Sequence, residues 1–233
     1  MSLSDDIKAE VKRIFAASWD ERQGQVVPEP KDLKLDNDAV KFDRATVLYA
    51  DLAGSTNLVD GKQWWFAAEV YRTYLYAAAK IIRDQGGVIT AYDGDRVMGI
   101  FVGDSQATPA ARCALKISAA VSNIINPALS AKYPDANYTV KHVIGIDSSS
   151  IRAARIGVRG GNDLVWVGQA ANHAAKLANL SGDKAVWITE AVFNRLHGDA
   201  KFGGANKDLM WAKYTWNAFG NKTIYGSNWT WAV

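Results

Sequence analysis

The sequence has 233 residues, of which 48% are hydrophobic and 22% are charged, and its formal net charge is +3. This length and composition predict one globular domain with a sizeable core, and so small a charge gives no support for a nucleic-acid partner. The single cysteine, Cys113, excludes a disulfide framework and fits a reducing compartment. No apolar run approaches 18 residues and the start, MSLSDDIKAEV, lacks the form of a signal peptide. We therefore expect a cytoplasmic protein without membrane insertion.

The first 43 residues are expected to precede the main domain, which we place at residues 44–233. Apolar residues at helical spacing after a serine and two aspartates predict an amphipathic helix over residues 4–18. The stretch ERQGQVVPEPKDLKLDNDAVKF, with its two prolines, predicts an extended linker. The helix could extend a dimer interface or dock a regulator, and packing on the protein's own surface is the expected arrangement.

The first half of the main domain is expected to follow the order strand, helix, hairpin, helix. The apolar run ATVLYADL predicts a central strand, and a long helix over residues 62–87 ends at two glycines. Two β-rich runs over residues 88–103 flank Asp93-Gly94, a strong hairpin signal. A second helix over residues 104–126 has Pro109 near its first turn.

The second half is predicted to add strands at 137–149 and 151–160, joined by a serine-rich turn. A helix over residues 167–182 follows, then a strand and a short helix capped by Thr189. The last 26 residues alternate aromatic and polar side chains and predict a closing β-hairpin. This order predicts an α+β protein with a ferredoxin-like, split-βαβ sheet.

Two aspartates mark one edge of the predicted sheet. Asp51 ends the first strand, and Asp95 follows the Asp93-Gly94 turn in the neighbouring hairpin. Adjacent carboxylates repel and need a counter-charge, and they suit Mg²⁺ or Mn²⁺ bound together with substrate phosphates. Taken singly, Asp51 is equally well a helix cap and the Asp-Gly-Asp run a plain turn. Together, on adjacent strands, they favour a metal site.

Further polar groups follow the predicted strand ATVLYADL, and others lie in the helix predicted over residues 167–182. Backbone amides of Gly54, Ser55 and Thr56 lie between strand and helix, where a polyphosphate can bind. Asn172 and Lys176 are four residues apart on one helix face and could stabilise charge on a phosphate, although a polar stripe on a surface helix is the plainer interpretation. The three histidines show no metal-type spacing: His173 is interpreted as packing or surface, and His142 and His197 have no evident partner.

Three motifs, in this order, resemble those of the class III nucleotidyl cyclases, the catalytic domain of adenylate and guanylate cyclases. VLYADLAGST resembles the first metal motif and YDGDRVMGIF the second, while VWVGQAANHAAKLANL resembles the transition-state helix. Lys176 stands where the family usually has arginine. The resemblance spans roughly residues 44–232 and implies the class III cyclase fold, a mixed sheet with helices and a closing hairpin.

This resemblance implies a specific chemistry. Asp51, Asp95 and the Leu52 carbonyl would hold two divalent ions, Mg²⁺ or Mn²⁺. The ribose 3′-oxygen of a nucleoside triphosphate would attack the α-phosphorus in line, and pyrophosphate would leave. Asn172 would orient the ribose and Lys176 would neutralise charge on the α-phosphate. Family members act as head-to-tail homodimers with two composite sites, so Asn172 and Lys176 need not reach Asp51 within one chain.

Four positions depart from the purine cyclases and bear on the base. Ala91 and Val165 replace the polar side chains that usually read a purine edge, and a site without such groups cannot discriminate through them. Tyr49, which alternation places on the metal face, is bulkier than the frequent phenylalanine, and Arg96 directly follows Asp95. A bulkier wall and a new cation indicate a smaller base with carbonyl acceptors.

This pattern, and VPEPKDLKLDNDAV before the first motif, resemble the pyrimidine cyclases of the bacterial Pycsar anti-phage systems. Their product activates a partner effector with a cyclic-nucleotide-binding module. Arg96 only donates hydrogen bonds, and uracil offers O4 as an acceptor, which favours UTP and a uridylate cyclase. Alternation points Arg96 away from the face of Asp95, so a dimer-interface role stays open. The alternatives are a cytidylate cyclase, an adenylate cyclase with relaxed base choice and an inactive nucleotide sensor; a structural interaction protein gives no reason for the two aspartates.

Overall fold

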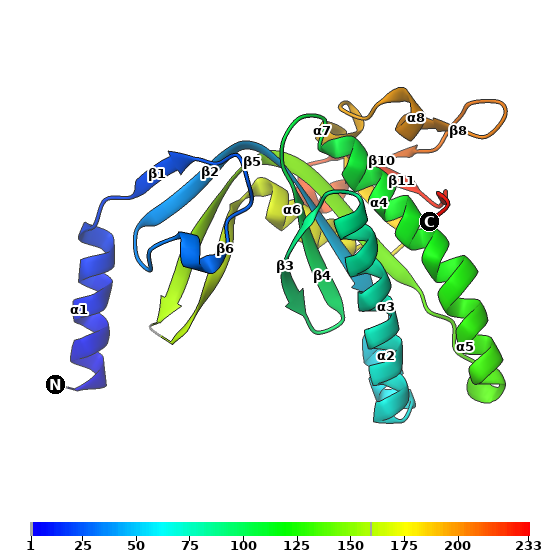
Figure 1. Cartoon of the computed structure of the whole chain (residues 1–233), viewed down its shortest axis with the longest axis horizontal. Coiled ribbons are helices and arrows are strands. Elements are labelled where there is room, and N and C mark those ends of the chain that lie inside the picture. The colour runs from blue at the N-terminus through cyan, green and yellow to red at the C-terminus, as the bar shows by residue number, and fades with distance from the viewer. Residues whose placement is uncertain (1, 159) are drawn as a thin grey trace.

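A nine-stranded mixed sheet forms the centre of the protein, and helices cover both of its faces (Figure 1). The computed structural model describes residues 2–158 and 160–233. The main path of the sheet runs β10-β11-β7-β5-β2-β4-β3, with β1 paired to β2 and β6 to β5. Its strands are β1 (Asp20–Gln23), β2 (Asp38–Leu52), β3 (Val88–Asp93), β4 (Arg96–Phe101), β5 (His142–Val158), β6 (Gly161–Gly168), β7 (Val186–Thr189), β10 (Ala212–Trp216) and β11 (Lys222–Ser227).

The helices connect these strands in the predicted alternation, and a separate two-stranded sheet joins β8 (Phe202–Gly203) to β9 (Asp208–Leu209). A π-helical turn, Val121–Ile125, links α4 to α5, and single 3₁₀ turns occur at Pro30–Asp32, Pro134–Ala136 and Asn217–Phe219. The helices are α1 (Leu3–Ala16), α2 (Ser55–Gly61), α3 (Trp64–Asp84), α4 (Ala107–Ala120), α5 (Asn126–Lys132), α6 (Gln169–Ala178), α7 (Glu190–Phe193) and α8 (Gly198–Lys201). No helix of the described residues is long and apolar enough to span a membrane.

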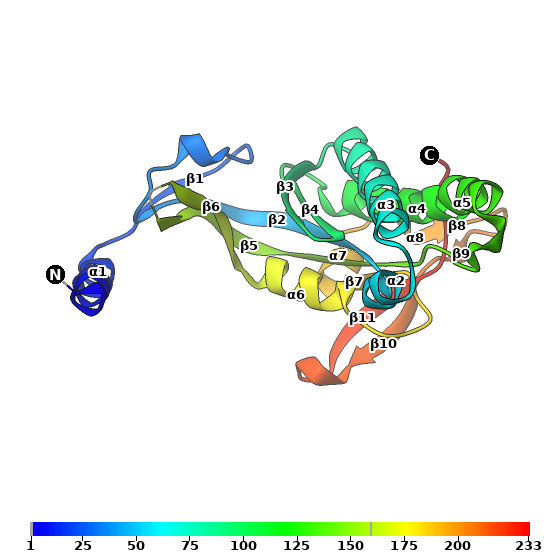
Figure 2. The ribbon, with the colours of Figure 1, turned by 90° about the horizontal axis from the view of Figure 1, so that it is seen from below.

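Strand β2 separates two cores because its side chains alternate between the faces of the sheet. Leu48 and Ala50 pack with buried residues of α3 and α4, whereas Val47 and Tyr49 pack with the buried alanines of α6. Figure 2 shows α3 and α4 on one side of the sheet and α6 on the other. The functional side chains of β2 are therefore fixed by a strand that is buried on both faces.

The predicted α+β fold is confirmed, and so are its main local signals. The hairpin β3–β4 turns at Gly94, whose φ of +61° favours glycine. Thr189 caps α7 by accepting a hydrogen bond from the Val192 N–H. The C-terminal residues form the expected hairpin, with Ala212–Trp216 antiparallel to Lys222–Ser227.

The prediction of two strands joined by a serine-rich turn is wrong. Residues 142–158 form one continuous strand, β5, and Ser148 lies within it, paired with Thr46 of β2. The chain reverses further on, where Val158 pairs with Gly161, and strand β6 has no counterpart in the prediction. Pairing with neighbouring strands outweighs the local preference of serine for turns, because strand propensity depends strongly on context.

The N-terminal segment also differs from the expectation. Strand β2 begins at Asp38, within the stretch predicted to be a linker, and β1 pairs with it in parallel. The predicted helix is present as α1, but it projects from the body (Figures 1 and 2) and has no buried residue. Packing on the protein's own surface was therefore the wrong expectation for α1. The division between residues 43 and 44 stays a prediction.

Candidate active site

The two predicted metal ligands lie at adjacent ends of the central strands. Asp51 is the penultimate residue of β2 and pairs in register with Arg96, the first residue of β4, and Asp95 lies in the turn just before Arg96. Burial, and next the negative charge of Asp95, raise the pKa of Asp51 to about 6. The carboxylates are thus close enough to repel each other, as the split-βαβ arrangement predicts.

This pair fits a hard divalent cation. Asp95 Oδ2 is buried and has no hydrogen-bond partner among the described residues, and an unpaired buried carboxylate oxygen is costly. The described part of the chain holds no cluster of three or more His, Cys, Asp or Glu side chains suited to a metal. Two carboxylates with the remaining ligands from a carbonyl such as that of Leu52, from water and from phosphate are what Mg²⁺ or Mn²⁺ accepts.

Three tyrosines that the sequence patterns did not single out surround the carboxylates. The hydroxyl of Tyr74, which is fully buried on α3, donates a hydrogen bond to the Asp51 backbone carbonyl at 3.2 Å. Burial, and next the charge of Asp95, raise the pKa of Tyr71 one turn earlier, and the Tyr138 hydroxyl is buried without a partner among the described residues. The spacing of Tyr71 and Tyr74 on one helix face was the available sequence signal.

The predicted phosphate loop follows Asp51 directly. Gly54 precedes α2 with a φ of +75°, which favours glycine, and a Cβ at this position would meet no atom within 4 Å. Ser55 is half-buried and Thr56 is exposed at the first turn of α2. Backbone N–H groups of a first helical turn have no partner within the helix, so the loop offers donors next to the carboxylates.

The predicted base-contacting residues of the central strands share one patch. Tyr49 pairs with Met98 of β4, and Met98 pairs with Ala91 of β3, so the three lie in one row across the sheet. The Arg96 guanidinium lies 5.4 Å from the centroid of the Tyr49 ring and forms a 2.7 Å ion pair with Asp93. Arg96 therefore belongs to the face of Tyr49.

The proposed transition-state residues lie on helix α6. Helix α6 rests directly on β5, so closely that a Cβ at Gly145 would clash with the Ala174 carbonyl oxygen. Asn172 and Lys176 are on its exposed face, and Val165 on β6 is 43% exposed. Among the described residues, no hydrogen bond or ion pair joins Asn172 or Lys176 to either aspartate. Within one chain, no side-chain interaction among the described residues links these two side chains to the carboxylate pair.

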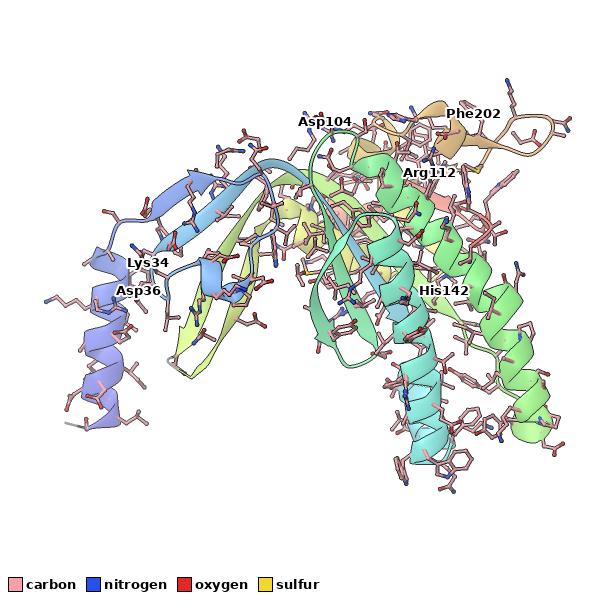
Figure 3. All side chains as sticks on the ribbon, viewed as in Figure 1. Lys34, Asp36, Asp104, Arg112, His142 and Phe202 are labelled. Carbon is pink, nitrogen blue, oxygen red and sulfur yellow. The ribbon has the colours of Figure 1, made fainter. Side chains whose placement is uncertain are left out.

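Two of the three histidines are packed in the interior. His173 is confirmed as a packing residue, since its Nδ1 lies 2.9 Å from Asp147 Oδ2 in the interior. His142, labelled in Figure 3, is buried against Tyr74 and lies 3.0 Å from the Ser118 hydroxyl. Burial lowers the pKa of His142 to about 4. His197 lies 3.2 Å from the Ser105 hydroxyl, away from the site.

Asp51 and His142 are expected to give opposite pH dependences of stability. The pKa of Asp51 rises from 3.8 to about 6 on folding, so folding favours the protonated carboxyl group. The stability gained in this way is lost as pH rises toward 6. The pKa of His142 falls from 6.5 to about 4, so its contribution is lost as pH falls below 6.5. These effects are worth about 3 kcal/mol for His142 and about 1–2 kcal/mol for the partly solvated Asp51.

Urea unfolding of the metal-free protein between pH 4 and 7 checks this prediction. Relative to wild type, Asp51→Asn should steepen the rise of stability with pH, because the opposing group is removed. His142→Gln should remove that rise while keeping a hydrogen-bonding group near Ser118. Parallel curves for all three proteins would contradict the assignment of either group.

Two solved structures with the same architecture are nucleotide cyclases. A bacterial light-regulated adenylyl cyclase superposes with a TM-score of 0.68 at 19% identity, over 79% of this chain and 51% of that chain. The guanylyl cyclase Cya2 superposes with a TM-score of 0.67 at 18% identity, over 82% of this chain and 94% of that chain. The fold is therefore that of a class III nucleotidyl cyclase catalytic domain.

Proteins with similar sequences show to which family of cyclases the chain belongs. The chain is 51% identical to the uridylate cyclase of Burkholderia cepacia and 50% identical to that of Xanthomonas perforans, over all of this chain and all of each relative. No family model matches the sequence. The protein belongs to the uridylate cyclase family.

Proposed function

We propose that the protein converts UTP to 3′,5′-cyclic UMP and pyrophosphate. The observation that carries this proposal is the Tyr49–Arg96 pair next to Asp51. Ala91 lies in the same row of paired strand residues, at the position where purine cyclases have a polar side chain that contacts the base. Relatives named uridylate cyclase at about half identity over the full length support it.

The site residues have distinct roles in the proposed reaction. Bound at Asp51 and Asp95, two Mg²⁺ or Mn²⁺ ions would supply positive charge beside the ribose 3′-hydroxyl and the triphosphate. Tyr74 donates a 3.2 Å hydrogen bond to the Asp51 backbone carbonyl, which restrains the end of β2 that carries the carboxylate. Amides of the Gly54–Thr56 turn hold the phosphates, while the 3′-oxygen attacks the α-phosphorus in line and pyrophosphate leaves.

Asn172 and Lys176 act from a second copy of the chain in this proposal. Both are exposed on α6 and unconnected to the aspartates among the described residues, so a head-to-tail homodimer completes two identical sites. Asn172 orients the ribose, and Lys176 places a point charge on the α-phosphate, where arginine would give a planar fork. Val165 lies on β6, just before α6, and provides no polar group that could contact the edge of the base.

Tyr49 and Arg96 select the base in this proposal. Tyr49 is half-buried and narrows the space available to a nucleobase. The Arg96 Nε–H is buried and lacks a partner among the described residues, so a ligand acceptor would satisfy it. Uracil offers the O4 carbonyl, whereas cytosine presents an amino donor at the same position, and a guanidinium cannot accept that hydrogen bond.

Incubation with each of the four nucleoside triphosphates and Mn²⁺, with products identified by mass spectrometry, tests the proposal. We expect cyclic UMP to exceed every other product, and Arg96→Met to reduce this preference about tenfold or more. The exposed Arg83→Met is the matched control and should behave as wild type. A cyclic CMP or cyclic AMP majority would contradict the base assignment, and tight binding without pyrophosphate release would indicate a nucleotide sensor.

The proposed biological role is that of a cytoplasmic second-messenger enzyme in bacterial anti-phage defence. The motif resemblance to Pycsar cyclases supports this role, and cyclic UMP would activate a separate effector through its cyclic-nucleotide-binding module. Phage challenge of cells that carry the protein with its neighbouring genes, compared with Asp51→Asn, tests it. Equal plaque counts for both would argue against defence.

A further inference from the structure

The C-terminal hairpin meets α6 beside Lys176. Trp216 ends β10, and Phe219 follows in the 3₁₀ turn Asn217–Phe219. Their rings stack with centroids 4.1 Å apart and planes tilted by 27°. We call these two rings the aromatic platform. The Lys176 ammonium lies over this platform, with Nζ 4.5 Å from the centroid of the Phe219 ring.

His173 joins the platform to the sheet. Its ring meets Trp216 and Phe219 edge to face, at 5.7 Å and interplanar angles of 75° and 79°. Its Nδ1 is 2.9 Å from Asp147 Oδ2, and the Thr189 hydroxyl donates to Asp147 Oδ1 at 2.5 Å. Asp147 is only 3% exposed. The helix turn that carries Asn172 and Lys176 is thus tied to β5, β7 and the hairpin at once.

Lysine at position 176 does not fix the position of its own charge, and the aromatic platform can do so. A lysine ammonium is a point charge on a flexible four-carbon stem, and it lacks the preorganised fork of arginine. A ring face attracts a cation and restricts where it lies. The ring of Phe219 is half-buried and rigidly stacked, so it holds the ammonium without neutralising its charge or occupying it with a carboxylate.

We propose that the aromatic platform of Trp216 and Phe219, anchored through His173 to Asp147, positions Lys176 for its contact with the substrate phosphate. This inference rests on the proposed nucleotide cyclisation. Phe219, Trp216 and His173 are positioning residues, since they act through Lys176. A positioned cation lowers the barrier more than it tightens ground-state binding, so the effect belongs to kcat rather than KM.

Steady-state kinetics of Phe219→Leu with UTP and Mn²⁺ test the inference. We expect kcat to fall about fivefold with KM nearly unchanged, and Phe219→Tyr, which keeps the ring face, to restore kcat. In a Lys176→Met background, Phe219→Leu should cause no further loss, because the two residues act as one unit.

A second lysine–phenylalanine pair supplies the control. The Lys201 ammonium lies 5.1 Å from the centroid of the Phe193 ring, and Phe193 stacks on Tyr225 at 3.8 Å. Phe193→Leu removes an equivalent pair that packs in a different core cluster from Trp216, so it should lower the melting temperature and leave kcat unchanged. A similar loss of kcat in Phe193→Leu would show a general stability effect and overturn the inference.

The remaining outcomes separate this inference from the proposed function. Wild-type kcat in Phe219→Leu, or additive losses in the double variant, would overturn the platform's role and leave the cyclase assignment standing. Full activity in Lys176→Met would also overturn it, because the residue to be positioned would have no role. Wild-type protein that forms no cyclic nucleotide from any triphosphate would overturn both.

Discussion

Asp51→Asn is expected to abolish cyclisation and to stabilise the metal-free protein. The substitution removes half of the carboxylate pair, and the described residues include no cluster of three or more His, Cys, Asp or Glu side chains that could bind the ions instead. We therefore expect kcat to fall at least about a thousandfold, about 4 kcal/mol of transition-state stabilisation. The same change removes repulsion from Asp95 and the cost of partly burying a charge. The free energy of unfolding at pH 7 should therefore rise by about 1–2 kcal/mol.

Loss of function with a gain in stability distinguishes a metal ligand from a structural aspartate. Melting curves with and without Mn²⁺ provide the second measurement: wild type should be stabilised by the ion, and Asp51→Asn much less. Asp60→Asn, an exposed aspartate of α2, is the matched control and should change neither activity nor the response to Mn²⁺. A destabilised Asp51→Asn, or one that keeps activity, would contradict the assignment of the carboxylate pair.

Mixing two inactive variants is expected to restore activity. Asp51→Asn lacks the carboxylate pair but keeps α6, whereas Asn172→Ala, which should itself lose about a hundredfold, lacks the amide but keeps the carboxylates. In a head-to-tail dimer that contains one chain of each variant, both substitutions fall in the same site, and the other site is intact. Equal amounts, allowed to exchange subunits, should recover about a quarter of wild-type activity.

The matched control mixes two variants with defects in the same half-site. Asp51→Asn with Asp95→Asn leaves no intact site in any pairing, so activity should stay at background. Recovery in the first mixture alone supports composite sites, and the size of the recovered species by light scattering shows that it is a dimer. No recovery with proven subunit exchange would mean that each chain builds its own site.

Local sequence signals were sufficient to predict much of the fold of this protein. The Asp-Gly turn of β3–β4 and the Thr189 cap depend on residues close together in sequence, and the structure has both. The two aspartates could be placed at one sheet edge because a hairpin beside the first strand leaves little choice of neighbour. The three sequence motifs also indicate the cyclase fold, because each is a short run of neighbouring residues.

Other features depended on packing between distant segments. The serine run in β5 is strand because β2 pairs along it, which outweighs local turn preference. Tyr74 reaches the Asp51 carbonyl from another element, and nothing near either residue in sequence specifies that contact. Projection of α1 away from the body likewise has no local signal, since the same apolar stripe would suit a docked helix.

By itself, the sequence determined the fold class, most of the helices and strands, and the placement of the two aspartates at one sheet edge, because each rests on short-range periodicity, turn chemistry and adjacent strands. Only the tertiary structure decided that Arg96 lies against Tyr49, that His173 is tied to Asp147, and that Lys176 rests on Phe219. Those contacts join residues of different elements, and their geometry follows from how the helices and the final hairpin pack on the sheet.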